Sequence, residues 1–312
     1  MNFLVTGGSG FIGSHLVKEL LKAGHQVKVL DNFSSGKMEN LKETVNCSRL
    51  EIINGDVLNW NELNNSMYGM DGVFHLAALV SVPVSIREPQ LNFEQNIQGT
   101  HNVFEIARLN HIKKIVYASS AAVYGDTTQT PIHEDLLPNP INPYGYAKYI
   151  TEQLGQMYNR TYMVDSVALR FFNVYGPNQD PCSVYSGVIS KFIHLMKNGQ
   201  SPTIYGDGGQ TRDFVYVMDV VSAMIGAMLS TQSGFKCYNV GSGQTLSIRA
   251  LIQLLNEIFQ QNIPPLYEKD RQGDIRHSVS DISKISEELG FEPQWSILDG
   301  LNELISFEKT GI

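Results

Sequence analysis

The sequence predicts an α/β fold in which a doubly wound parallel sheet is followed by a smaller C-terminal α/β lobe. Short β-rich runs alternate with helical stretches through the first half of the chain, which is typical of a parallel sheet covered on both faces. The segments between the runs are long enough for right-handed crossovers. Near residue 173 this alternation ends, and prolines and glycines become frequent. We therefore expect one domain over 1–173 and a second over 174–312, with some later segments returning to the first.

The expected strands of the first domain are six β-rich runs, and an amphipathic helix over 11–23 joins the first two. The six runs lie at 2–6, 26–31, 49–54, 72–77, 112–119 and 164–172. The second lobe is expected to hold helices at 188–197, 247–260 and 283–289 and a short strand at 203–205.

Composition and charge exclude several classes of protein. Apolar residues make up 42% and charged residues 17% of the chain, which is typical of a globular protein. No apolar run reaches the roughly 18–20 residues that span a bilayer, and the N-terminus lacks the regions of a signal peptide. The three cysteines have no metal-ligand spacing, so we expect a cytoplasmic protein without a metal site. The net charge of −8 opposes binding to nucleic acid or to an anionic membrane.

A glycine-rich turn follows the first expected strand and opens the first expected helix. Gly7, Gly10 and Gly13 have the spacing that lets a backbone approach a pyrophosphate at the helix N-terminus. Asp31 ends the second strand, 18 residues after Gly13, where a carboxylate binds ribose hydroxyls and repels a 2′-phosphate. The motif therefore predicts a dinucleotide site that prefers NAD to NADP.

A tyrosine and a lysine four residues apart form the candidate catalytic pair. Tyr144 and Lys148 lie on one face of an expected helix. We expect the lysine ammonium to lower the pKa of the phenol, so that Tyr144 can act as a general base. Ser120 ends an apolar strand, at the edge where doubly wound sheets bind ligands, and is placed to hydrogen-bond a substrate oxygen.

Three further runs occur in order with these motifs: HLAA at 75–78, NIQGT at 96–100 and LRFFN at 169–173. Together the motifs make the chain similar to the extended short-chain dehydrogenase/reductases that act on nucleotide sugars, and the likeness covers essentially the whole chain. The resemblance implies a Rossmann domain that binds NAD and a second domain that binds a UDP-sugar. It also implies a homodimer in which each subunit contributes two helices.

For the cofactor, the resemblance implies contacts with the glycine turn, with Asp31 and with the catalytic pair. Lys148 would also hold the nicotinamide ribose, and Phe172 would lie near the nicotinamide. The implied NAD-binding residues are Gly7, Gly10, Phe11, Ile12, Gly13, Asp31, Asn32, Asp56, Val57, Ala77, Ala78, Tyr144, Lys148 and Phe172.

For the substrate, the resemblance implies that Tyr205 packs on the uracil ring. Arg212 and Arg271 would bind the diphosphate, for which guanidinium groups are suited. Asp274 would bind the uridine ribose. The implied substrate-binding residues are Ser81, Asn96, Ser120, Asn173, Val188, Tyr205, Arg212, Arg271, Asp274 and Ser278.

Two alanines after Ser120 narrow the reaction. Similar 4,6-dehydratases carry an Asp-Glu pair at the places of Ala121 and Ala122, and similar nucleotide-glucuronate decarboxylases usually carry Glu at the second place. Methyl groups move no protons, which leaves oxidation and reduction at C4, the pattern of the UDP-sugar 4-epimerases. The alternatives are a UDP-glucuronate 4-epimerase, another NAD-dependent nucleotide-sugar modifier or, in a different class, a catalytically silent NAD-binding regulator.

Ser278 bears on the choice of sugar. Similar enzymes restricted to glucose and galactose often carry a tyrosine at this place, whereas serine leaves room for an N-acetyl group. We therefore expect interconversion of UDP-N-acetylglucosamine and UDP-N-acetylgalactosamine, and also of UDP-glucose and UDP-galactose. Val84 stands where relatives often carry Arg, and Phe171 where some carry Tyr, so the sugar preference stays open.

Overall fold

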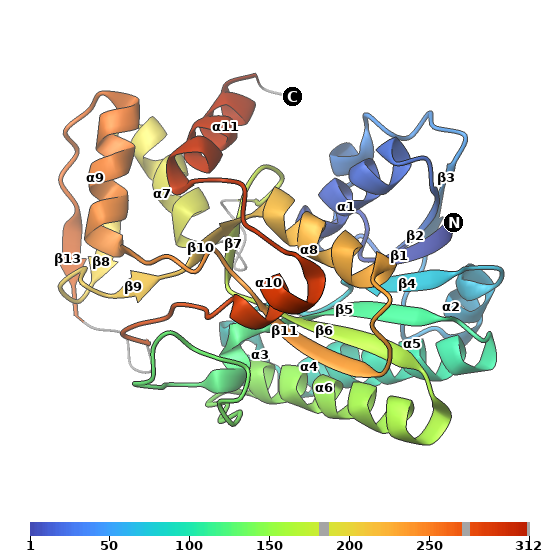
Figure 1. The fold of residues 1–312 in the computed structure, drawn as a ribbon. Helices are drawn as coiled ribbons and strands as arrows, with labels where there is room; N and C mark the ends of the chain where they lie inside the picture. Colours follow the sequence, from blue (N-terminus) through green and yellow to red (C-terminus); the bar gives the residue numbers. More distant parts are fainter. Residues whose placement is uncertain (181–186, 270–274, 311–312) are drawn as a thin grey trace.

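The central sheet has seven parallel strands, and the computed structural model describes the chain over residues 1–180, 187–269 and 275–310. The strand order places β1 between β4 and β2, so the winding reverses at β1. All neighbouring strands are parallel, and their carboxyl ends therefore meet at one edge (Figure 1). In spatial order the strands are β11 (Phe235–Val240), β6 (Asp165–Phe171), β5 (Lys114–Ser120), β4 (Gly72–His75), β1 (Asn2–Thr6), β2 (Gln26–Asp31) and β3 (Leu50–Asn54).

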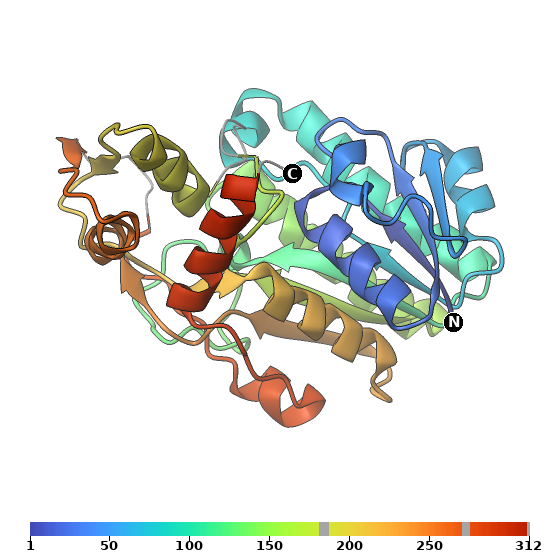
Figure 2. The same ribbon diagram turned by 90° about the horizontal axis from the view of Figure 1, so that it is seen from above.

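Helices cover both faces of this sheet, as Figures 1 and 2 show. On one face, α1 (Phe11–Lys22) and α8 (Val217–Leu229) bury their apolar residues against the strands in a common core. On the other face, α2 (Trp60–Met67), α5 (Gly99–Leu109) and α6 (Pro143–Tyr162) form a second core. The doubly wound α/β architecture predicted from the sequence is confirmed.

The seventh strand comes from beyond residue 173. β11 pairs with β6 from Phe235 opposite Ser166 to Val240 opposite Phe171. The preceding helix α8 packs on the same sheet, so two elements from beyond residue 173 lie on the sheet that the first half of the chain forms. The six expected strands are all present, with ends that differ by at most two residues. Strand β11 was not expected, because its pairing partner is 69 residues earlier in the chain and leaves no local signal.

The second lobe has a hydrophobic core of its own. Helices α7 (Val188–Lys197), α9 (Ile248–Phe259) and α11 (Ile297–Thr310) pack around it, with Leu251 and Leu301 fully buried. The apolar residues of α9 recur at the helical period, which is why this segment buries one face. None of the helices in the described part of the chain combines the length and apolar character of a membrane span.

Short elements connect the larger ones and shape the edge of the sheet. They are η1 (Met38–Leu41), α3 (Val82–Arg87), α4 (Pro89–Asn92), η2 (Phe93–Gln98), η3 (Ala121–Tyr124), β7 (Asn173–Tyr175), β8 (Thr203–Tyr205), β9 (Thr211–Arg212), β10 (Phe214–Tyr216), β12 (Leu246–Ser247), β13 (Leu266–Glu268) and α10 (Ser283–Leu289).

A buried ion pair joins α6 to the sheet. Arg170 of β6 donates from Nε and Nη2 to the two carboxylate oxygens of Glu152, at 2.9 and 2.7 Å. Ser119 of β5 donates from Oγ to the same carboxylate at 2.5 Å. The Arg170 and Glu152 side chains are only 6% and 3% exposed. Charges removed from water in this way stay favourable only while both partners are present.

Arg170→Ala is expected to lower the free energy of unfolding by about 3–5 kcal/mol, because it leaves the Glu152 carboxylate buried without its partner. Urea unfolding followed by circular dichroism measures the loss. Lys22→Ala is the matched control, because the Lys22 and Glu19 side chains are 60% and 28% exposed and such a pair contributes less than about 1 kcal/mol. Equal losses in the two variants would contradict the prediction.

Candidate active site

A groove of about 480 Å³ lies along the edge where the strands end. The loop after β1, the end of β2 and the segments after β3, β4 and β6 all line it, together with α6. It is thus a direct product of the parallel sheet. All fourteen residues expected to bind NAD line this groove: Gly7, Gly10, Phe11, Ile12, Gly13, Asp31, Asn32, Asp56, Val57, Ala77, Ala78, Tyr144, Lys148 and Phe172.

The glycines of the first turn are required by close backbone contacts. Gly7 has φ +69°, and a Cβ placed on it would lie 2.7 Å from the backbone nitrogen of Ala77. A Cβ on Gly13 would lie 2.2 Å from the carbonyl oxygen of Gly7. Gly10 is less crowded, with Gly7 O at 3.2 Å from its added Cβ. Two of the three glycines therefore let β1, β4 and α1 approach one another, while Gly10 borders the groove.

The groove fits a dinucleotide at two points. Helix α1 begins at Gly10 with no side chain capping it, so the N–H groups of its first turn face the groove as a site for phosphate. At the end of β2, the two Asp31 carboxylate oxygens accept hydrogen bonds from Ser9 N and Phe33 N, each at 2.9 Å. These bonds hold a negative charge where it would meet a ribose.

Three candidate catalytic residues meet at the other end of the groove. Tyr144 and Lys148 come from the first turns of α6, and Ser120 ends β5. The Ser120 hydroxyl is hydrogen-bonded to the Tyr144 hydroxyl and accepts from Ala122 N at 3.1 Å. Lys148 Nζ donates to Ala118 O at 2.9 Å and lies 5.9 Å from the centre of the Tyr144 ring. The structure thus brings together the three groups that the sequence singled out.

The expected lowering of the Tyr144 pKa is wrong: the surrounding protein groups raise the pKa of this phenol. Burial raises the pKa of Tyr144, and the hydrogen bond from Ser120 only partly opposes it. Burial also lowers the pKa of Lys148 to about 8, against the opposing effect of the Glu152 carboxylate. Desolvation disfavours the charged form of both groups and outweighs their attraction, because Lys148 points to a backbone carbonyl.

A buried histidine, His75, connects elements beside the groove. His75 Nδ1 contacts Thr6 Oγ1 at 2.7 Å, and its Nε2 contacts Thr100 Oγ1 at 3.0 Å. Burial lowers the pKa of His75 to about 3, so the ring is neutral and links β1, β4 and α5 without adding charge. The HLAA run therefore serves in part to hold the strands that carry the glycine turn and Ala77.

Several lining residues were missed by sequence reasoning. Ser34, Ser35, Lys37 and Asn40 line the groove beside Asp31. Lys37 Nζ forms an ion pair with Asp180 Oδ2 at 2.8 Å, which connects the β2 loop to the segment after β7. A lysine a few residues after Asp31 was a possible signal, but its partner is 143 residues away in sequence.

Asn96 and Ser81, which were expected to bind the substrate, are not among the residues that line the groove. Asn96 is 1% exposed, exchanges hydrogen bonds of 2.9 Å with both backbone groups of Leu79, and also donates to Asn92 Oδ1. Ser81 is 2% exposed and caps α3 by accepting from Val84 N at 3.2 Å. Both residues hold the segment after β4 in place.

The other expected substrate residues lie in or beside the second lobe. The backbone nitrogen of Ser278 donates to Thr211 O at 3.2 Å, which puts Ser278 next to the strand of Arg212. Asp213, which sequence reasoning missed, accepts from Ser242 N and Ser280 N at 2.7 and 3.0 Å and ties these segments together. Asn173 donates to Asp213 O, while Val188 begins α7 and Tyr205 ends β8.

Two of the expected substrate residues, Arg271 and Asp274, lie outside the described residues. Within the described ranges, Ser120 is the expected substrate residue that lines the groove. In the same ranges, no three His, Cys, Asp or Glu side chains are grouped closely enough to hold a metal ion.

Comparison with known proteins gives matches over the whole length. A curated relative from Methanocaldococcus jannaschii, named a putative UDP-glucose 4-epimerase, is 37% identical over 98% of both chains. The solved UDP-N-acetylglucosamine 4-epimerase from Methanobrevibacter ruminantium M1, in complex with UDP-N-acetylmuramic acid, is 39% identical with a TM-score of 0.95 over 100% of this chain and 99% of that one. The solved UDP-glucose 4-epimerase from Thermotoga maritima, with UDP-glucose, is 38% identical with a TM-score of 0.94 over the same shares.

The family model described as the NAD dependent epimerase/dehydratase family matches residues 3–241. Apart from Asn2 at the start of β1, this stretch holds all seven strands of the main sheet, and it contains every residue that lines the groove. Since the match covers well over half of the chain and the relatives agree over its full length, the protein belongs to the NAD-dependent epimerase/dehydratase family.

Proposed function

We propose that the protein is a UDP-sugar 4-epimerase that interconverts UDP-N-acetylglucosamine and UDP-N-acetylgalactosamine, and also UDP-glucose and UDP-galactose. The observation that carries the reaction type is the meeting of Ser120, Tyr144 and Lys148 in one groove. The two residues that follow Ser120 are the alanines 121 and 122, which offer no acid or base for loss of water or carbon dioxide. Relatives named UDP-sugar 4-epimerases support the same reading.

In this mechanism, the Tyr144 oxygen takes the proton of the sugar 4-hydroxyl and later returns one. The Ser120 hydroxyl, already paired with Tyr144, orients the same sugar oxygen. NAD, which the residues lining the groove would hold, would supply the acceptor and donor of the C4 hydride. Lys148, positioned by Ala118 O, supplies positive charge beside the phenol, and its position in the groove suits it to hold the nicotinamide ribose. The 4-keto sugar turns about its link to the diphosphate between the two transfers.

The alternatives have less support. A UDP-glucuronate 4-epimerase needs a cation facing the sugar carboxylate. Among the described residues that line the groove, the cations are Lys37 and Lys148; Lys37 is paired with Asp180, and Lys148 donates to Ala118 O. A silent regulator has no need of a buried Tyr-Lys pair, whereas here both side chains line the groove.

The homodimer is part of the proposal. Helix α6 exposes Tyr146, Ile150 and Met157, which recur on one helical face and are 39–53% exposed. Phe93 of η2, the segment packed against α6, is 51% exposed. An apolar surface on two adjacent helical segments suits isologous pairing with a second copy.

Light scattering is expected to give twice the 34.8 kDa mass of the chain. Ile150→Glu is expected to shift the mass toward one chain, because it places a charge in the centre of the apolar surface. Leu137→Glu is the control, since Leu137 is 83% exposed outside α6 and η2. A wild-type protein with the mass of one chain would rule out the dimer.

Tyr144→Phe is expected to lower kcat by at least about 100-fold, the low end of the contribution of a general base. Its NAD content, measured after denaturation, should not change. Ser120→Ala removes one hydrogen bond and should cost about tenfold. Tyr146→Phe is the matched control on the same helix, and it should keep full activity because Tyr146 does not line the groove and phenylalanine keeps its aromatic ring. Near-full epimerase activity in Tyr144→Phe would show that the mechanism is wrong.

The choice of sugar is tested at Ser278, which is 7% exposed beside the strand of Arg212. Ser278→Tyr should lower kcat/KM for the N-acetyl pair selectively, because the added ring occupies volume that only the larger sugar needs. Ser278→Ala keeps that volume open and should act on both pairs. The measurement is kcat/KM for both substrate pairs in the three proteins. Equal losses on both pairs, or a wild type inert toward N-acetyl sugars, would contradict the assignment.

A further inference from the structure

Glu152 lies one helical turn after Lys148 in α6 and has no part in the mechanism described so far. It is 2% exposed, and Lys148 is 5% exposed. Its two carboxylate oxygens accept three hydrogen bonds, one from Ser119 at 2.5 Å and two from Arg170 at 2.7 and 2.9 Å. A single carboxylate thus connects α6 with β5 and with β6.

Each of these contacts lies next to a residue that lines the groove. Ser119 lines the groove itself and directly precedes Ser120, and Arg170 directly precedes Phe171 and Phe172. One residue before Ser119, the carbonyl oxygen of Ala118 accepts from Lys148 Nζ at 2.9 Å. Helix α6, which carries Tyr144 and Lys148, is therefore bonded to the end of β5 at two points one helical turn apart, Lys148 and Glu152.

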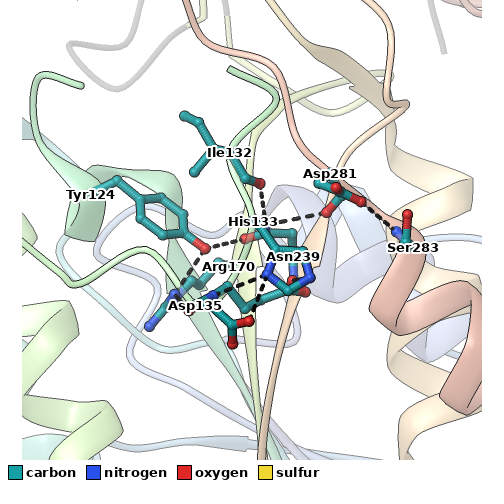
Figure 3. A network of polar contacts seen from close by, with 9 residues as sticks. Tyr124, Ile132, His133, Asp135, Arg170, Asn239, Asp281 and Ser283 are labelled. Atoms are coloured by element: carbon teal, nitrogen blue, oxygen red, sulfur yellow. Dashed lines mark hydrogen bonds and ion pairs between the residues drawn. The ribbon is translucent and has the colours of Figure 1, made fainter. Parts of the chain in front are cut away.

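The guanidinium of Arg170 also contacts Tyr124, within the network of polar contacts in Figure 3. Its Nη1 donates to the Tyr124 hydroxyl at 2.8 Å, which in turn donates to Asn239 Oδ1 at 2.6 Å. Asn239 Nδ2 donates to Ile132 O at 2.8 Å. The orientation of the guanidinium that pairs with Glu152 is thus fixed by Tyr124 of η3 and, through Asn239, by β11 and the loop that precedes α6.

We infer that Glu152 is a positioning residue for the epimerase reaction, holding Tyr144 and Lys148 of α6 in register with Ser120 of β5. This inference rests on the proposed function of those three residues. Glu152 does not contact the groove, because its carboxylate is enclosed by Ser119 and Arg170. It acts on the reaction only through the groups that it holds.

The charges around Glu152 give this role a measurable signature. It is the anion between two buried cations, Arg170 from β6 and Lys148 on its own helix, and it helps Lys148 to keep its proton. The other titratable groups that face it are Tyr117 from β5 and Cys237 from β11, while Lys148 also faces His75 from β4. None of these three carries a negative charge near neutral pH, since burial raises the pKa of Tyr117 and Cys237 and His75 is neutral.

The test is Glu152→Gln, which keeps the shape of the side chain and removes its charge. We expect kcat to fall at least about tenfold, with little change in the KM for the UDP-sugar. Lys148 should lose its proton at a lower pH, so the alkaline limb of the kcat profile should move down by about one pH unit, the low end for loss of a nearby opposite charge. Glu105→Gln is the matched control. Glu105 does not line the groove and pairs with Arg108, with 2.6 Å between Oε1 and Nη2, so its substitution should leave the pH profile unchanged.

Ser119→Ala keeps the inference testable if Glu152→Gln does not fold. It removes one hydrogen bond to Glu152 and leaves the ion pair, so kcat per NAD-containing molecule should fall about fivefold while the alkaline limb stays in place. If both variants are less stable but keep the wild-type kcat and pH profile, Glu152 is only structural and the inference is overturned. If Glu152→Gln does not fold, an unchanged kcat in Ser119→Ala overturns it.

Failure of the proposed function gives a different result. In that case, the wild type converts no UDP-sugar, or Tyr144→Phe remains fully active, whatever happens at Glu152. If Tyr144→Phe loses activity while Glu152→Gln keeps the kcat and pH profile of the wild type, only the positioning role is rejected.

Discussion

Because the seven strands of the main sheet run in the same direction, their carboxyl ends all lie at one edge of the sheet. The glycine turn after β1, Asp31 of β2, Ala77 after β4 and Ser120 of β5 come together for this reason alone. The same constraint obliges the strands to be buried on both faces, and two separate hydrophobic cores meet this need. The groove is therefore a place where polar groups from several strands can face a ligand.

The buried charges near this edge partly offset one another. Lys148 and Arg170 bring two positive charges under the groove, and Glu152 brings the negative charge between them. Burial favours the neutral forms of both Tyr144 and Lys148, which raises the pKa of one and lowers that of the other. A positive charge close to the Tyr144 hydroxyl would favour the phenolate.

The two lobes divide the work that we propose for the enzyme. The first lobe supplies the dinucleotide groove and the catalytic groups, all within or beside the parallel sheet. The second lobe brings Arg212 next to Ser278, and the buried Asp213 ties their segments to Ser242 and Ser280. Since β11 and α8 pack on the main sheet between segments of the second lobe, the chain crosses from one lobe to the other repeatedly. The relative position of sugar and cofactor thus depends on both lobes.

The sequence by itself was enough for features that depend on short spacings. Gly7, Gly10 and Gly13 identify a turn between a strand and a helix, and Tyr144 and Lys148 share a helical face, because local geometry follows from residue separation. Only the tertiary structure could decide what depends on distant partners. It added β11 to the sheet, paired Glu152 with Arg170, and turned Asn96 and Ser81 toward the backbone and away from the groove. It also reversed the expected shift in the pKa of Tyr144, because desolvation depends on everything that surrounds a side chain, and no spacing in the sequence records this.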